Sequence, residues 1–347
     1  MMKLFFLSLI AVTVFATSGN AQDPTSSPVA YMNAIENAQK DMDQKYMAYM
    51  SAAAHGRRAR KLEKMRKQVL ESITNSRYAI INLPFYKGDN TLRQSSIDYV
   101  ALCYNVFNDD YNKIVNTEEI AEQSFDGMQA FILLQEKTNE KIKEASEKIH
   151  QAEKAFAAKY NVNLIEGSSE LGEKMAIAGK LNHYRNQLYL IYFKCNWQDG
   201  QMVDAMNKKK VNDVEQSRGS IIRYADEGIL ALDSLKFFMG DATLGNACKE
   251  MLKYYKRMAE NDVPKLTDYF LKQENFEKIK KAFDAKSASS RTKEDVDAFN
   301  KAVGEINAGV KTYNDTNNKI NKERTQALNE WEKTEKEFAD KHMPRYR

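Results

Sequence analysis

Residues 79–92 read AIINLPFYKGDNTL and residues 231–244 read ALDSLKFFMGDATL, so that seven of fourteen positions are identical at a constant shift of 152. Self-similarity at a fixed period is the signature of a repeat architecture. The sequence therefore predicts two tandem related repeats, residues 29–160 and 182–342, joined by a linker at 161–181.

Apolar residues on both sides of this stretch recur at three- and four-residue steps, as in Leu62, Met65, Val69 and Ile73. This period is typical of amphipathic helices, and only two prolines lie between residues 29 and 343. The predicted fold class is all-α, an elongated helical bundle built from the two repeats. The expected helices span residues 30–83, 92–114 and 117–159 in the first repeat, and 180–237, 244–260, 263–284 and 293–341 in the second.

The shared motif Phe-x-x-Gly-Asp-x-Thr-Leu predicts a turn between two helices. Glycine suits the left-handed conformation that ends a helix, and Asp and Thr oxygens can cap the helix that follows. One Asp and one Thr offer too few oxygens for a dedicated calcium site. The predicted structural turn residues are Gly88, Asp89, Thr91, Gly240, Asp241 and Thr243.

The N-terminus is typical of a secretory signal peptide. Lys3 precedes an apolar run from Leu4 to Ala16, and small residues stand at −3 and −1 of a cut after Ala21. The run is shorter than the roughly 20 residues that span a bilayer, and no Cys near the cut could carry lipid. We therefore expect a signal peptide at 1–21, a flexible N-terminus at 22–28, no transmembrane segment after cleavage, and a C-terminal tail at 343–347. The protein is expected in the periplasm, at the cell surface or outside the cell.

Three cysteines, Cys103, Cys195 and Cys248, leave at least one thiol unpaired within the chain. No C-x-x-C spacing indicates redox or metal chemistry, and all three lie in apolar, helix-like segments. Buried, inert thiols are the favoured interpretation, and one disulfide bond between two of them stays open.

Lys and Arg number 52 against 48 Asp and Glu, a formal charge of +4 that is too small to indicate nucleic-acid binding. Positive charge is concentrated in one run after His55, with a weaker counterpart in the second repeat. These residues are candidates for binding an anion or partner: Arg57, Arg58, Arg60, Lys61, Lys64, Lys67, Lys208, Lys209 and Lys210. Acidic helix 117–159, solvent, or an external polyanion such as lipid headgroups, acidic polysaccharide or a partner protein could balance them.

Aromatic residues are dense between residues 184 and 197. Core packing is the default interpretation, because the apolar positions follow one helix face. Tyr189, Phe193 and Trp197 lie four residues apart on an adjacent strip. If that strip is exposed, it forms a groove for a partner.

No nucleophile elbow, Walker loop, dinucleotide fingerprint or H-E-x-x-H motif occurs in the sequence. Glu147 and His150 have the Glu-x-x-His spacing of di-iron bundles, but such a site needs a second copy of the motif, which is missing. We therefore expect no catalytic residue, no metal and no cofactor.

Residues 46–61, preceded by Tyr31-Met32-Asn33, resemble the start of a family of signal-peptide-bearing, all-helical surface or envelope proteins of Bacteroidota and spirochaetes, a family without an assigned function. The resemblance covers the first helix. It implies placement in the envelope or at the cell surface and supplies no catalytic residues.

These patterns favour an exported, non-catalytic helical bundle that acts by surface binding or scaffolding in the cell envelope. Protein, or an anionic envelope polymer or lipid headgroup, is the expected partner. The alternative is a periplasmic chaperone-like or lipid-associated protein that holds clients between helices. A metal-dependent helical-bundle enzyme is the third option.

Overall fold

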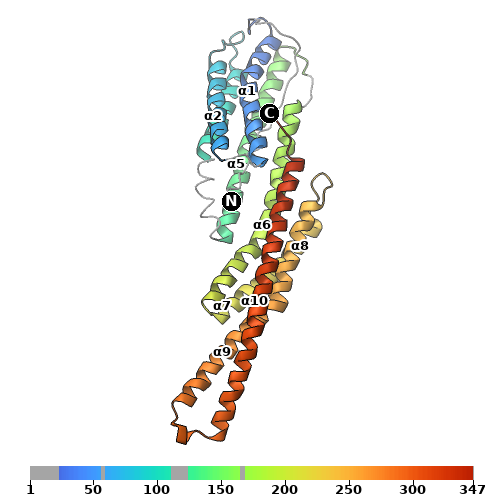
Figure 1. Cartoon of the computed structure of the whole chain (residues 1–347). Helices are drawn as coiled ribbons and strands as arrows, with labels where there is room; N and C mark the ends of the chain where they lie inside the picture. Colours follow the sequence, from blue (N-terminus) through green and yellow to red (C-terminus); the bar gives the residue numbers. More distant parts are fainter. Residues whose placement is uncertain (1–22, 56–58, 111–123, 165–168, 347) are drawn as a thin grey trace. The chain divides into compact units, whose positions relative to one another are not determined.

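The computed structural model describes residues 23–55, 59–110, 124–164 and 169–346 (Figure 1). These residues form helices joined by turns and contain no β-strand, which confirms the all-α fold class. The chain packs as two compact units: residues 1–186 with 337–347 form unit 1, and residues 187–336 form unit 2. The expected signal peptide lies outside the described residues.

Unit 1 starts with a well-defined helix N-terminus. Ser27 Oγ accepts a hydrogen bond from the Ala30 backbone N–H at 3.0 Å, and Pro28 occupies the first helical turn. The helical elements of the unit are α1 (Pro28–Ala54), α2 (Ala59–Ile81), α3 (Thr91–Asn105), the π-helical turn η1 (Val106–Asp110), α5 (Phe125–Lys159) and the first half of α6 (Glu170–Asn207).

Aromatic rings from three parts of the chain form one end of the core of unit 1. The Tyr86 ring lies 5.4 Å from both Tyr31 and Phe156 and 4.9 Å from Tyr160. Tyr31 also donates a hydrogen bond from its hydroxyl to the Pro84 carbonyl at 2.9 Å. The turn between α2 and α3 is thereby fixed to the start of α1 and the end of α5.

Unit 2 contains the rest of α6, then α7 (Val211–Ser234), α8 (Thr243–Arg257), the π-helical turn η2 (Met258–Asp262), α9 (Val263–Asp284), a short 3₁₀ turn η3 (Ala288–Ser290) and most of α10 (Lys293–His342). Figure 1 shows α9 and the first half of α10 as a helical hairpin. Stacked Phe283 and Phe299 rings, 4.5 Å apart, pack its two helices together.

The helix expected at 263–284 has these bounds, but it does not start a separate element. It continues α8 through η2, where the Val263 N–H donates to the Met258 carbonyl five residues back. Pro264 has no N–H to give to the carbonyl four residues before it, so a wider turn accommodates it.

The two long first helices expected at 30–83 and 180–237 are wrong, because each is divided in two. In unit 2 the break follows α6, where Lys209 has a φ of 55° and the Lys210 N–H donates to the Ala205 carbonyl at 2.9 Å. A left-handed residue followed by an N–H that donates to the carbonyl five residues back is a common way for a helix to end. The start of α6 at Glu170 also lies inside the segment expected to be a linker.

The two Gly-Asp motifs build the same turn. Lys87 and Gly88 have φ angles of 49° and 83°, and Met239 and Gly240 have 50° and 78°. Backbone bridges join Tyr86 with Asp89 and Phe238 with Asp241. The glycines therefore lie inside tight turns and do not end helices as expected, since α2 and α7 end at Ile81 and Ser234.

The capping role expected for the aspartates is present. Asp89 Oδ1 accepts from the Thr91 N–H and Asp241 Oδ1 from the Thr243 N–H, each at 2.9 Å. The starts of α2, α3 and η1 recur at a shift of 152 as the starts of α7, α8 and η2. A common origin of the two segments stays a prediction.

Gly240→Ala should destabilise the protein by about 1 kcal/mol, because an L-residue is strained at a φ of 78° although nothing lies within 4 Å of the added Cβ. Gly219→Ala is the matched control, since its site in α7 is equally open and helical, and it should be neutral or stabilising. Denaturant unfolding of both variants measures the difference. Equal effects would contradict the role given to the turn.

Candidate functional site

The predicted basic run is exposed where it is described. Arg57 and Arg58 lie outside the described residues, whereas Arg60, Lys61, Lys64 and Lys67 are exposed on α2. Two acidic residues of the helix expected to face them have other partners: Glu136 lies 3.3 Å from His183, and Glu147 lies 3.8 Å from Lys143. These four basic residues therefore form a solvent-facing surface.

The aromatic strip expected on α6 is not one exposed groove. Phe193 is buried in the core and its ring lies 5.7 Å from that of Tyr189, which is half-buried. Trp197 is half-buried and lines a separate cavity. The strip thus divides between the core and a candidate site.

That cavity, the α6–α7 cleft, has a volume of about 270 Å³. It brings Trp197 together with two of the predicted basic residues, Lys208 and Lys210, whereas Lys209 contacts Gln273 on α9 at 3.3 Å. The other lining residues are mainly polar: Gln198, Gln201, Asp204, Ala205, Asp213, Gln216, Ser217 and Ser220. The short turn at 208–210 places these side chains of the two helices opposite one another.

The charges in the cleft are balanced. Lys208 Nζ lies 2.6 Å from Asp204 Oδ2, and Lys210 Nζ lies 3.6 Å from Asp213 Oδ2. Each cation thus has a carboxylate beside it. The cleft offers both hydrogen-bond donors and acceptors next to an aromatic ring, which suits a polar ligand more than a simple anion.

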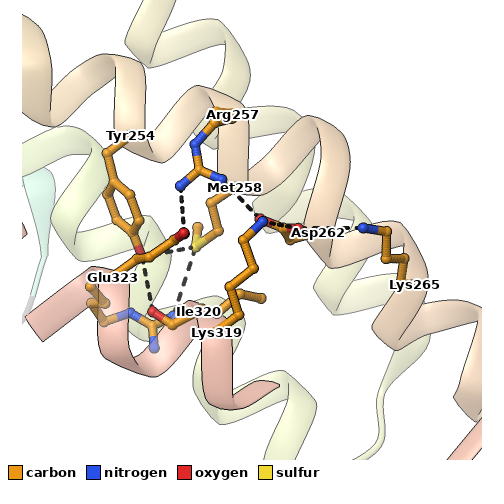
Figure 2. A network of polar contacts seen from close by, with 9 residues as sticks. Tyr254, Arg257, Met258, Asp262, Lys265, Lys319, Ile320 and Glu323 are labelled. Carbon is orange, nitrogen blue, oxygen red and sulfur yellow. Dashed lines mark hydrogen bonds and ion pairs between the residues drawn. The ribbon is translucent and has the colours of Figure 1, made fainter. Parts of the chain in front are cut away.

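A second polar cluster lies around η2 and α10 (Figure 2). Asp262 has a side chain only 1% exposed, and three cations surround it: Arg257 at 3.2 Å, Lys319 at 2.9 and 3.0 Å, and Lys265 at 3.5 Å. Arg257 also contacts Glu323 at 2.6 Å. Asp262 directly precedes α9, a position where Asp commonly caps a helix, but its carboxylate makes no cap hydrogen bond. The carboxylate oxygens of Asp262 are thus occupied by cations. We call this cluster the Asp262 clamp, and it holds η2 to α10.

A neighbouring buried ion pair adds to this attachment. Arg324 donates from Nε to Asp199 Oδ2 at 2.7 Å and from Nη2 to Oδ1 at 2.9 Å, and the two side chains are 16% and 7% exposed. Burial raises the pKa of Asp199, and the bond to Arg324 only partly offsets it. This bidentate pair joins α6 to α10 within unit 2.

Unit 1 contains a row of polar side chains that the sequence reasoning missed, the polar seam. Glu36, Gln39, Asp43 and Tyr46 follow one face of α1 at three- and four-residue steps, beside the buried apolar residues of the helix. Among the described residues, Gln39 Nε2, Asp43 Oδ1 and the Tyr46 hydroxyl are inaccessible and have no hydrogen-bond partner. Unpaired buried polar atoms are unfavourable and unusual in a folded protein.

The buried carboxyl groups in the polar seam and beside it have raised pKa values. Burial raises the pKa of Asp43 and that of Glu153 on α5 to about 7, and Glu36 contributes by repulsion in both cases. Burial also raises the pKa of Glu36, with Lys40 opposing the shift. His150 Nδ1 lies 3.5 Å from Glu153 Oε2, which is too far for a good hydrogen bond.

The three thiols are free and buried, as the favoured interpretation had it. Burial raises the pKa of Cys195 to about 12 and that of Cys103 and Cys248 further still. In the described part of the chain, no three His, Cys, Asp or Glu side chains form a group that could hold a metal ion. None of the described helices is long and apolar enough to cross a bilayer.

Comparison with known proteins adds no relative: no family model, curated protein or solved structure matches the chain. The resemblance of the first helix to envelope proteins stays a prediction.

We expect the stability of the protein to fall as the pH rises from about 4 to 7. The folded-state pKa of Asp43 and Glu153 lies above the ordinary value, so their contribution is present at low pH and is lost as the pH passes through 7. Asp43→Asn and Glu153→Gln should each reduce this slope, by about 1 kcal/mol or more over the range. Melting temperatures between pH 4 and 8 measure it.

Asp41→Asn is the control for this series, because Asp41 lies on the exposed face of the same helix beside Lys45. Its slope should match that of the wild type. A flat profile for the unmodified protein would contradict the burial of the two acids.

Arg324→Met should cost about 3–5 kcal/mol, because it leaves the buried Asp199 carboxylate without a partner. Asp199→Asn combined with Arg324→Met should recover a large part of that loss. Lys272→Met, which breaks the exposed pair with Asp268, should cost less than about 1 kcal/mol. Denaturant unfolding compares the three, and similar losses for Arg324→Met and Lys272→Met would refute a structural role for the buried pair.

Proposed function

We propose that the protein is an exported, non-catalytic binding protein of the cell envelope that holds a hydroxyl-rich ligand, a glycan chain, in the α6–α7 cleft. The main support for the proposal is that Trp197 lines the same cavity as a charge-balanced set of hydrogen-bond donors and acceptors. Export and envelope placement rest on the sequence of residues 1–21 and on the resemblance of the first helix.

The charge balance of the cleft argues for a glycan rather than a polyanion. Because Asp204 and Asp213 stand beside Lys208 and Lys210, a strongly anionic chain gains little net attraction there. Sugar hydroxyls both donate and accept hydrogen bonds, and so do the three glutamines and two serines in the lining. The expected anionic polymer is therefore the weaker candidate for this cleft.

Trp197 supplies the apolar part of recognition. An indole ring offers a large apolar face and a single N–H donor, which suits the C–H face of a sugar ring bordered by hydroxyls. The volume of about 270 Å³ lies near the lower end for small-molecule sites, so the cleft fits one or two sugar units of a longer chain.

The test uses Trp331→Phe, which leaves Trp197 as the sole tryptophan. Neutral β-glucan oligosaccharides and muramidase-released peptidoglycan fragments are added, with alginate as the polyanionic comparison. We expect at least one of the first two to change Trp197 fluorescence with little dependence on salt. Calorimetry should then show affinity lowered at least tenfold by Trp197→Ala, about 1.4 kcal/mol, and unchanged by Lys209→Gln, whose side chain lies outside the cleft.

Two results would overturn the proposal. Binding of alginate alone, weakened by salt, would show that charge and not hydroxyl recognition governs the cleft. Release of reducing ends from a bound glycan would show that the protein is an enzyme.

A further inference from the structure

Two large side chains protrude from unit 1 beside the α2–α3 turn. Tyr78 is 58% exposed near the end of α2, and Phe85 is 53% exposed in the turn. The neighbouring Tyr86 is 1% exposed within the aromatic core. Burial of Tyr86 and the two positive φ angles that follow fix the direction of Phe85 toward solvent.

Basic residues are more frequent than acidic ones in the segment that carries these two rings. Between residues 77 and 93 the charged residues are Arg77, Lys87 and Arg93 against a single carboxylate, Asp89. Lys159, at the end of α5, adds a fourth cation and contacts Asp89 at 2.7 Å. The Asp89 side chain is only 7% exposed, so the outer surface of this region, the Phe85 patch, is cationic and aromatic.

One of the cations also orders the patch. Arg93 donates to the carbonyls of Ile80 and Ile81 at the end of α2, and its guanidinium lies 5.1 Å from the centre of the Phe85 ring. A cation over a ring face restrains that ring. Arg77 and Lys87 keep exposed side chains for an external partner, whereas the Lys159 ammonium is paired with Asp89.

The equivalent turn of unit 2 has the same shape but no excess of positive charge, because its one lysine, Lys236, stands against Asp233 and Asp241. At a shift of 152, Leu230 and Phe237 replace Tyr78 and Phe85 and are 71% and 46% exposed, with Met239 71% exposed beside them. Ile229 and Gly245 stand where the first turn has Arg77 and Arg93. The two turns can therefore be compared within one chain: both expose apolar side chains, but only the turn of unit 1 has a net positive charge.

We propose that the Phe85 patch docks on the surface of an anionic lipid bilayer, with Phe85 and Tyr78 entering the headgroup region and Arg77 and Lys87 facing lipid phosphates. Charge complementarity selects this partner, because each basic residue near an anionic leaflet contributes binding and aromatic rings favour the membrane interface. A protein partner would need a far larger continuous surface than two protruding rings provide. The inference is independent of ligand binding in the α6–α7 cleft.

The test is co-sedimentation of the full chain with vesicles of phosphatidylcholine alone or with 30% phosphatidylglycerol. Retention on neutral vesicles measures any contribution of the apolar run at residues 4–16 and is subtracted. We expect binding that needs phosphatidylglycerol and weakens with salt. Arg77→Gln with Lys87→Gln should lower the partition coefficient about 25-fold, which is about fivefold, or ~1 kcal/mol, for each charge.

Phe85→Ser should also lower binding to the anionic vesicles, whereas Phe237→Ser, its counterpart in unit 2, should leave it unchanged. Circular dichroism verifies that each variant keeps its helices. The proposal is overturned if the wild type does not bind anionic vesicles at low salt, or if Phe85→Ser and the double glutamine variant bind as the wild type does.

Discussion

Two successive residues in the left-handed conformation reverse the chain between α2 and α3 and again between α7 and α8. Few L-residues adopt this conformation without strain, so a glycine in the second position satisfies the constraint at low energetic cost. The residue directly before each turn, Tyr86 or Phe238, lies in the core. The preceding residue, Phe85 or Phe237, faces solvent. The turn also places an aspartate where it caps the next helix, so the direction of α3 and of α8 follows from it.

The sequence was sufficient for the fold class and for several elements. Regular apolar spacing predicts helices whatever their tertiary partners, which is why α9 and α10 were located almost to the residue. The breaks after Ala54 and Asn207 were missed. The second break has no glycine or proline in its sequence, and it depends on Lys209 adopting a positive φ. Similarly, Asp262 before Pro264 is a common helix start in sequence, but three cations from spatial neighbours compete for its carboxylate.

The candidate sites were predictable only in part. Trp197, Lys208 and Lys210 were selected from the sequence, but their position in one cavity depends on the unpredicted turn between α6 and α7. Charge was misjudged for a different reason: Asp204 and Asp213, only four and three residues from Lys208 and Lys210, pair with them and were not weighed against the run of lysines. The polar seam had a visible signal, polar residues at heptad-like steps on α1, but this pattern is also that of an exposed helix face.

Each of the two units contains at least one buried thiol, whose reactivity can report the local unfolding of that unit. Cys103 belongs to unit 1, and Cys195 and Cys248 belong to unit 2, and in the folded chain all three are shielded from reagents in water. A thiolate forms at an appreciable rate only when the surrounding helices separate, since burial holds these groups in the protonated state. Alkylation followed by peptide mass analysis would therefore report local unfolding of the two units separately, without any introduced label.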